Sequence, residues 1–120
     1  MIIHAPSAQA QFSAEKMGKV TLGAGNYLYA GLNCFEPGQS HQAHVHADQD
    51  KLYVVLEGTG EASVGGESAV VNTGDVILAP AGVTHSMSNP GPGRLTVMIV
   101  FAPPPKKMSR KLFSRSGSEV

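Results

Sequence analysis

Two short stretches contain four of the five histidines of this chain: Gly38-Gln39-Ser40-His41-Gln42-Ala43-His44-Val45-His46 and Gly74-Asp75-Val76-Ile77-Leu78-Ala79-Pro80-Ala81-Gly82-Val83-Thr84-His85. Side chains alternate between the two faces of an extended strand, so we expect the His44 and His46 imidazoles to project from one face. His85 follows a Pro-x-Gly turn that begins a new strand. If that strand packs beside the first, the three imidazoles close a facial three-nitrogen metal site.

Short strand-like runs separated by glycine and proline turns continue from end to end, and helical periodicity of useful length is absent from the sequence. Gly65-Gly66 predicts a two-residue hairpin. Many short strands and tight turns favour an all-β sandwich or barrel, and the jelly roll is the form that places strands face to face around an interior. The predicted strands are 19–22, 27–35, 43–46, 52–56, 60–64, 69–72, 76–79, 84–88 and 95–101.

The spacing of glycine, proline, histidine and asparagine in and after these stretches resembles the two sequence motifs of the cupins. The matching residues are Gly38, His44, His46 and Gly58 for the first motif, and Gly74, Pro80, Gly82, His85 and Asn89 for the second. The resemblance covers residues 38–89, less than half of the chain. It implies a small single-domain cupin, all-β, with a double-stranded β-helix or jelly-roll barrel.

The resemblance also implies how the chain is divided. We expect an N-terminal arm over residues 1–17, a barrel over 18–105 and a basic tail over 106–120. Within the arm, residues 13–16 are predicted to form one helical turn, and Phe12 is a candidate docking anchor. In cupins such arms, and the sheet face opposite the metal, serve in dimerisation, so a homodimer is expected.

The family's ligand positions fall on His44, His46 and His85, and the resemblance therefore implies one bound divalent transition metal. Iron, manganese, nickel, copper and zinc all accept imidazole, so the ligand types do not select among them. His41 precedes the strand and is expected beside the site or at its mouth.

One position departs from the family pattern. A glutamate normally lies seven residues before the closing glycine of the first motif, and Lys51 stands there in this chain. At roughly 5 Å and an effective dielectric of about 20, its charge would oppose a divalent ion by on the order of 6 kcal/mol. Lys51 therefore turns away, loses its proton, or marks a site that no longer holds metal. Asp50 and Gln49 are the nearest substitute ligands, and a bulge after His46 would bring Asp50 inward.

If Lys51 faces the interior, strand alternation adds Tyr53 to the same wall. Lys51 and Tyr53 are then the candidate substrate-binding residues, and the ammonium favours a small anionic ligand. Tyr53 is equally well explained as a core aromatic with its hydroxyl at the rim. The lone Cys34 is predicted to be a small buried hydrophobe, and it excludes an internal disulfide.

The charge is zero overall but unevenly distributed. Residues 106–120 contain five bases and one acid, for a charge of +4, and the rest contains four bases and eight acids, for −4. Five basic residues without a recognition fold predict a solvated or self-docking tail, so no nucleic-acid partner is expected. No run reaches the roughly 18 apolar residues of a membrane span. We expect a soluble, cytoplasmic protein without a membrane partner.

Three function classes fit these residues. The first is a metal-dependent dioxygenase or other oxidoreductase acting on a small carboxylate or enol, because some cupin dioxygenases work with three histidines. The second is a non-catalytic small-ligand-binding or sensing cupin in which Lys51 holds an anion. The third is a metal-dependent isomerase or lyase. Fold alone does not choose among them.

Overall fold

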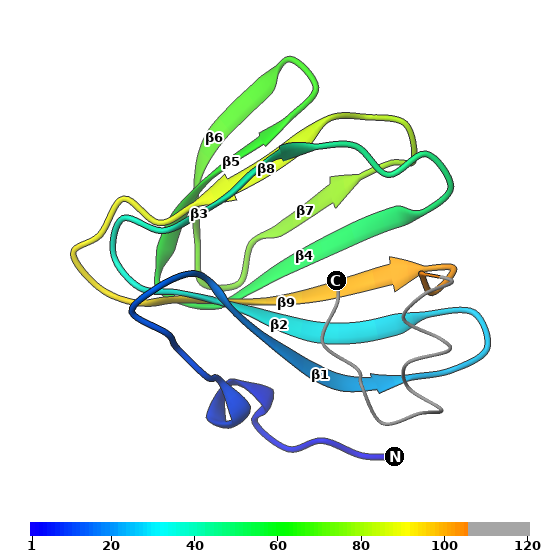
Figure 1. Cartoon of the computed structure of the whole chain (residues 1–120), viewed down its shortest axis with the longest axis horizontal. Coiled ribbons are helices and arrows are strands. Elements are labelled where there is room, and N and C mark those ends of the chain that lie inside the picture. The colour runs from blue at the N-terminus through cyan, green and yellow to red at the C-terminus, as the bar shows by residue number, and fades with distance from the viewer. Residues whose placement is uncertain (106–120) are drawn as a thin grey trace.

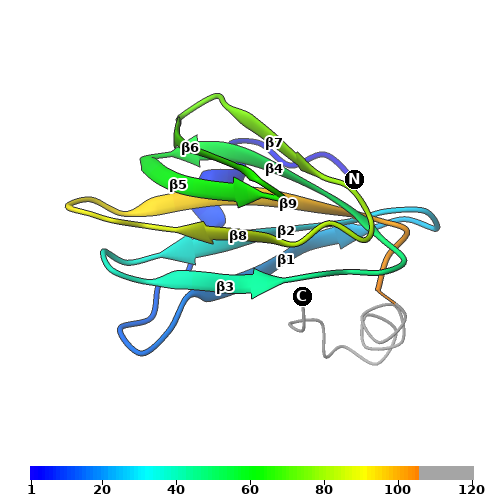
Figure 2. The same ribbon diagram turned by 90° about the horizontal axis from the view of Figure 1, so that it is seen from above.

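The structure is a computed structural model that describes residues 1–105. Its strands form two antiparallel sheets that face each other, as Figures 1 and 2 show from two directions. The strands are β1 (Gly18–Ala24), β2 (Tyr29–Phe35), β3 (Ser40–His44), β4 (Asp50–Glu57), β5 (Thr59–Val64), β6 (Glu67–Asn72), β7 (Val76–Ala79), β8 (His85–Ser88) and β9 (Leu95–Ala102). One sheet has the order β1-β2-β9-β4-β7 and the other β3-β8-β5-β6.

This arrangement confirms the predicted jelly-roll barrel. Each predicted strand has an observed counterpart, and Val64 pairs with Glu67 across the predicted Gly65-Gly66 hairpin. One predicted strand boundary is wrong, and it affects how His46 is positioned. The strand predicted to reach residue 46 instead begins at Ser40 and ends at His44, so His46 approaches the interior from a loop.

Strand alternation sorts the five-stranded sheet into an inner and an outer face. Lys51, Tyr53 and Val55 are buried along β4, and the residues between them are half-buried. Lys51 pairs with Phe101 and Tyr53 with Ile99 in β9. These inward residues meet the four-stranded sheet in one core cluster, whose members are Met17, Tyr29, Phe35, Tyr53, Val55, Ala62, Val71, Ala79, Met87, Leu95, Val97, Ile99 and Phe101.

The closing glycine of the first motif has a clear structural reason. Gly58 joins β4 to β5 with a φ of +92°, a region that L side chains rarely adopt. A Cβ atom at this position would also collide with the carbonyl oxygen of Arg94. Only glycine therefore lets the chain pass from one sheet to the other here.

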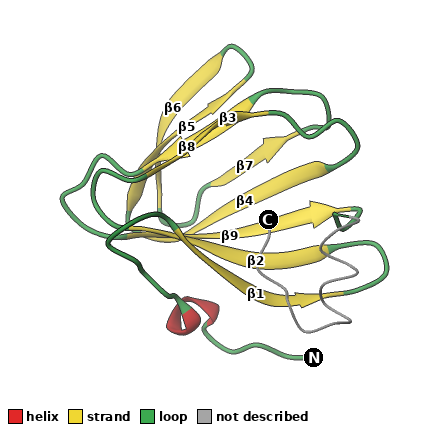
Figure 3. Cartoon of the chain, viewed as in Figure 1, coloured by secondary structure: helices red, strands yellow, loops and turns green. Residues whose placement is uncertain are grey.

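The N-terminal arm packs against its own barrel. The Gln39 side chain donates a 2.7 Å hydrogen bond to the Ser13 carbonyl, and the Arg94 guanidinium lies 4.3 Å from the centre of the Phe12 ring. The predicted helical turn is misplaced: the arm contains a short 3-10 helix, η1 (Pro6–Gln9), and residues 13–16 are not helical. Figure 3 shows η1 in red, below the end of the five-stranded sheet that β1 forms.

Cys34, on the outward side of β2, is fully buried as predicted, and its thiol hydrogen-bonds the Gln11 backbone. Within residues 1–105, no helix is long and apolar enough to cross a membrane. The predicted basic tail, 106–120, lies outside the described residues.

Candidate metal centre

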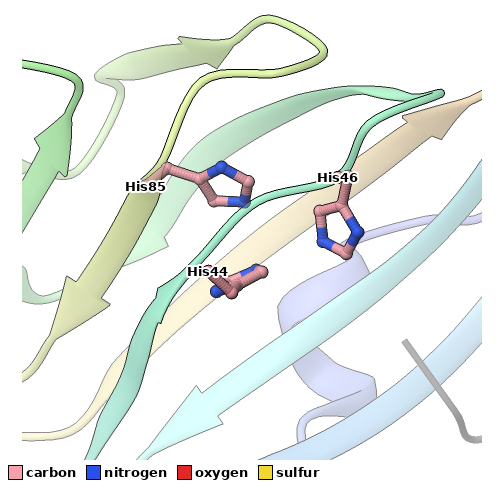
Figure 4. Close-up of side chains that lie close together, drawn as sticks. All are labelled: His44, His46 and His85. Atoms are coloured by element: carbon pink, nitrogen blue, oxygen red, sulfur yellow. The ribbon is translucent and has the colours of Figure 1, made fainter.

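Two segments bring three histidines together. His44 ends β3, His85 begins β8, and the two residues pair directly across the four-stranded sheet. His46 lies two residues beyond β3, and its carbonyl oxygen accepts a 2.9 Å hydrogen bond from the Gly82 amide. That bond ties the loop after β3 to the turn before β8. Figure 4 shows the three imidazoles grouped around a common space.

The geometry of these rings suits a metal ion. Candidate ligand nitrogens of the three histidines lie within 4.8 Å of one another. The Nδ1 atoms of His44 and His85 face the carbonyl oxygens of Gln42 and Val83 at 2.6 and 3.1 Å. A carbonyl oxygen only accepts, so each Nδ1 carries the proton and each Nε2 presents a lone pair. The Nε2 atoms of His44, His46 and His85 are all buried without a hydrogen-bond partner. Three inward lone pairs fit an imidazole-ligated transition metal.

Electrostatics keep these imidazoles neutral. Burial lowers the pKa of His46 to about 4, with smaller contributions from His44 and Lys51. Burial also lowers the pKa values of His44 and His85, although the backbone hydrogen bond of each raises them in part. A metal ligand must be neutral imidazole, so the three residues are ready to bind metal at neutral pH.

Lys51 points into the barrel. The residue has no exposed surface, and its Nζ lies 4.5 Å from the centre of the Tyr53 ring and 5.0 Å from that of Phe101. Nζ has no hydrogen-bond partner in the described part of the chain. Burial, and then the charge of Lys19, lower the pKa of Lys51 to about 7. Of the three outcomes left open by the sequence, turning away is therefore excluded, and ready loss of the proton fits the surroundings.

The alternative placement of Asp50 is wrong. Asp50 is exposed, and its Oδ1 accepts a 2.8 Å hydrogen bond from the Ala81 amide. The register of β4 runs without interruption from Asp50 to Val55, so no bulge turns Asp50 inward. The irregularity instead lies in β3, between His41 and His44. Gln49 precedes β4 and is half-buried. Among the described residues, no carboxylate joins the three histidines.

Two further buried polar side chains, those of His41 and Tyr53, lie beside the three histidines. The Tyr53 hydroxyl and the His41 Nδ1 are buried without partners, and the His41 ring lies 4.4 Å from that of His44. Burial lowers the pKa of His41 to about 3, helped by Lys51 and His44, and it raises the pKa of Tyr53. Asn33 is also fully buried, and neither polar atom of its side chain has a partner. The sequence analysis missed Asn33, although alternation along β2 could have placed it on the inner face.

The fold and the histidine arrangement together define a class of protein. The family model described as the Cupin domain matches residues 31–101, and the chain therefore belongs to the cupin family. An uncharacterised protein of Streptomyces coelicolor, SCO3923, is 36% identical over 77 residues, which are 64% of this chain and 71% of that protein.

Two solved structures extend the comparison. The structure of TT1209 from Thermus thermophilus superimposes with a TM-score of 0.83 at 33% identity and covers 88% of this chain and 100% of that one. A predicted oxalate decarboxylase from Thermotoga maritima superimposes with a TM-score of 0.62 at 25% identity, over 66% of this chain and 69% of that one. The chain is thus similar both to TT1209 and to a predicted enzyme.

Proposed function

We propose that this cupin binds one divalent transition metal through His44, His46 and His85. The observation that carries the proposal is the set of three buried Nε2 atoms, none of which has a hydrogen-bond partner among residues 1–105. Leaving three buried acceptors unpaired costs free energy that a bound metal would recover. A divalent metal held by three neutral imidazoles keeps its charge and open coordination positions, and would supply Lewis-acid or redox chemistry.

The proposed ligand of this centre is a small anion that carries a carboxylate or an enolate. Lys51 and Tyr53 are the proposed binding residues, because the Lys51 ammonium and the Tyr53 hydroxyl are both buried without partners. When protonated, Lys51 would attract a carboxylate, and the Tyr53 hydroxyl would donate a hydrogen bond to it. The charges that act on His44 and Lys51 include Lys19, which is also a cation. The local field therefore favours an anion over a cation.

The proposed reaction class is an oxidoreductase of the dioxygenase type acting on a small carboxylate or enol. Its support is the all-nitrogen ligand set, which leaves the metal without a neutralising carboxylate. A metal-dependent lyase is the second candidate, favoured by the 25% identity to the predicted oxalate decarboxylase. Both classes use the same three histidines and the same anionic substrate.

The test begins with the metal. Protein purified without chelator should contain close to one transition metal ion per chain by elemental analysis, and His46→Ala should lose most of it. His4→Ala is the matched control, because His4 is exposed and lies in the N-terminal arm. Equal metal content in wild type and His46→Ala would refute the site. Oxygen uptake with a panel of small acids would support the oxidoreductase, product formation without oxygen uptake the lyase, and binding without turnover a non-catalytic receptor.

We also propose that the protein forms a homodimer through the outer face of the five-stranded sheet. Apolar side chains continue across this face in two rows of the strand register. One row contains Leu78, Leu52, Val100 and Ala30, and the other contains Val76, Val54, Met98 and Leu32. Val76 and Leu78 are 60% and 59% exposed. Leu32, at the β2 end of the second row, is fully buried, so the exposed part of this face lies on β7 beside half-buried residues of β4 and β9. Exposed apolar side chains that continue into half-buried ones mark an association surface. Light scattering that gives a single-chain mass at micromolar concentration would exclude the dimer.

A further inference from the structure

Asn33 is a buried amide that finds no hydrogen-bond partner among residues 1–105. It lies on β2 between Tyr29 and Phe35, and alternation places all three side chains on the inner face with the core cluster. Asn33 has no exposed surface, and both Oδ1 and Nδ2 lack a hydrogen-bond partner. Such an amide costs roughly 1–3 kcal/mol relative to a satisfied one, so its presence calls for a partner outside the chain.

The surroundings of Asn33 connect it to the metal centre. Lys19 on β1 pairs directly with Asn33, and its charge acts on both His41 and His44. A short turn, closed by a 3.1 Å backbone hydrogen bond from Gln39, leads from β2 into β3 and folds the histidine strand back over β2. Lys19 therefore links Asn33, on the inner face of one sheet, to His41 in the opposite sheet.

The chemistry of an amide narrows what it would bind. Asn33 offers a donor at Nδ2 and an acceptor at Oδ1, and both are unpaired. A carboxylate oxygen could satisfy only the donor, and an ammonium only the acceptor. A hydroxyl group satisfies both, because it accepts from one atom and donates to the other. Water also meets this requirement, so the test must separate water from a ligand hydroxyl.

We propose that Asn33 is a specificity-determining residue that binds the hydroxyl group of a small hydroxy carboxylic acid. The acid's carboxylate would lie toward the metal and Lys51, and its hydroxyl toward Asn33. Only the placement of the carboxylate, near the metal and Lys51, rests on the proposed function. A site built to hydrogen-bond a hydroxyl discriminates strongly against the analogue that lacks it, because its own polar groups then stay unpaired.

Butyrate and its α-, β- and γ-hydroxy derivatives test the proposal, because they share one carboxylate and vary only the hydroxyl. Dissociation constants would be measured by NMR titration of Zn²⁺-loaded and of metal-free protein. Wild type should bind at least one hydroxy acid about tenfold more tightly than butyrate. Asn33→Leu should reduce that ratio to less than about threefold and leave the butyrate constant unchanged. Asn33→Ala, which cannot clash, should give the same loss if Asn33→Leu does not fold.

Asn26→Ala is the matched control, because Asn26 is an exposed loop asparagine, and it should keep the full preference. A wild type that binds none of the acids, or binds all four alike, would overturn the proposal and leave Asn33 as a water-binding residue. So would an unchanged preference in the Asn33 variants. Failure of the metal site is seen separately, as absence of Zn²⁺ binding, and the metal-free titration still tests Asn33 in that case.

Discussion

The two ends of the barrel interior lie between the same two sheets but differ in the polarity of their buried side chains. At the apolar end Phe35, Met87 and Leu95 are buried against one another's strands, and their side chains need no polar partner. At the histidine end β4 contributes Lys51 and Tyr53, and β3, the loop after it and β8 contribute the three histidines; the buried polar atoms of these side chains lack partners among the described residues. The apolar end stabilises the fold. The histidine end lowers stability, because its unpaired polar groups are arranged for a ligand.

The largest expected effect is a loss of stability when a side chain of the apolar end is removed. Leu95→Ala removes a fully buried side chain that packs above Gly60, and it should lower the free energy of unfolding by about 3 kcal/mol. Metal affinity of the folded protein should stay within about threefold of wild type, because Leu95 contacts no candidate ligand. Urea denaturation and metal titration measure the two quantities. A fall in metal affinity that matches the loss of stability would show that the two ends are not separable.

The next effect is a pH dependence at the histidine end. Burial lowers the pKa of Lys51 to about 7, from an ordinary value of 10.5. Below pH 7 the folded and unfolded states both hold the proton, and the folded state bears the full cost of the buried charge. Between pH 7 and 10.5 the unfolded chain holds more protons than the folded one, so stability rises with pH. Metal-free protein should gain about 2 kcal/mol between pH 7 and pH 9.

Denaturant titrations across this pH range measure the gain, and Lys51→Met is the control because it keeps the length of the side chain without its charge. The variant should have a flatter profile. If wild type and Lys51→Met have the same slope, the rise comes from other groups and the buried-charge argument fails.

A smaller effect is expected when a substitution reverses the sign of the charge beside the proposed metal site. Lys51→Glu should tighten metal binding at least about tenfold, equivalent to about 1.4 kcal/mol, because a carboxylate replaces a cation that faces the three histidines. The same change should weaken the binding of small carboxylates. Calorimetric titration with metal and with acetate gives both numbers, and Lys51→Met separates loss of the cation from gain of the anion. An unchanged metal affinity would remove the electrostatic basis of the anionic-ligand proposal.

The smallest effect concerns the rim of the histidine end. Asp50→Ala removes the acceptor of the Ala81 amide, and it should cost about 1 kcal/mol of stability. Metal affinity should change by less than about threefold, since the bond from Gly82 to His46 still holds the turn. A large loss of metal would instead mean that Asp50 helps to position His85. Thermal denaturation and metal titration together distinguish these results.

Several features followed from the sequence alone because they depend on local rules. A period of two predicted the strands, the Gly65-Gly66 pair predicted its hairpin, and alternation along β4 predicted that Tyr53 shares a face with Lys51. The resemblance to the two cupin motifs added the expectation that His44, His46 and His85 would meet, which the structure bears out in their grouping. Each of these inferences needs only neighbouring residues or a pattern of turns.

Other features were decided by the tertiary structure, because they depend on pairing between distant strands. The irregularity lies in β3 and not before β4, and the uninterrupted pairing of β4 with β9 turns Lys51 inward and leaves Asp50 exposed. A shift of one residue exchanges the two faces of a strand, and the sequence of β4 by itself does not specify which partner sets it. Asn33 is a second example. Its sequence neighbours predict a strand, but only the packing of the two sheets shows that its amide is buried without a partner among the described residues.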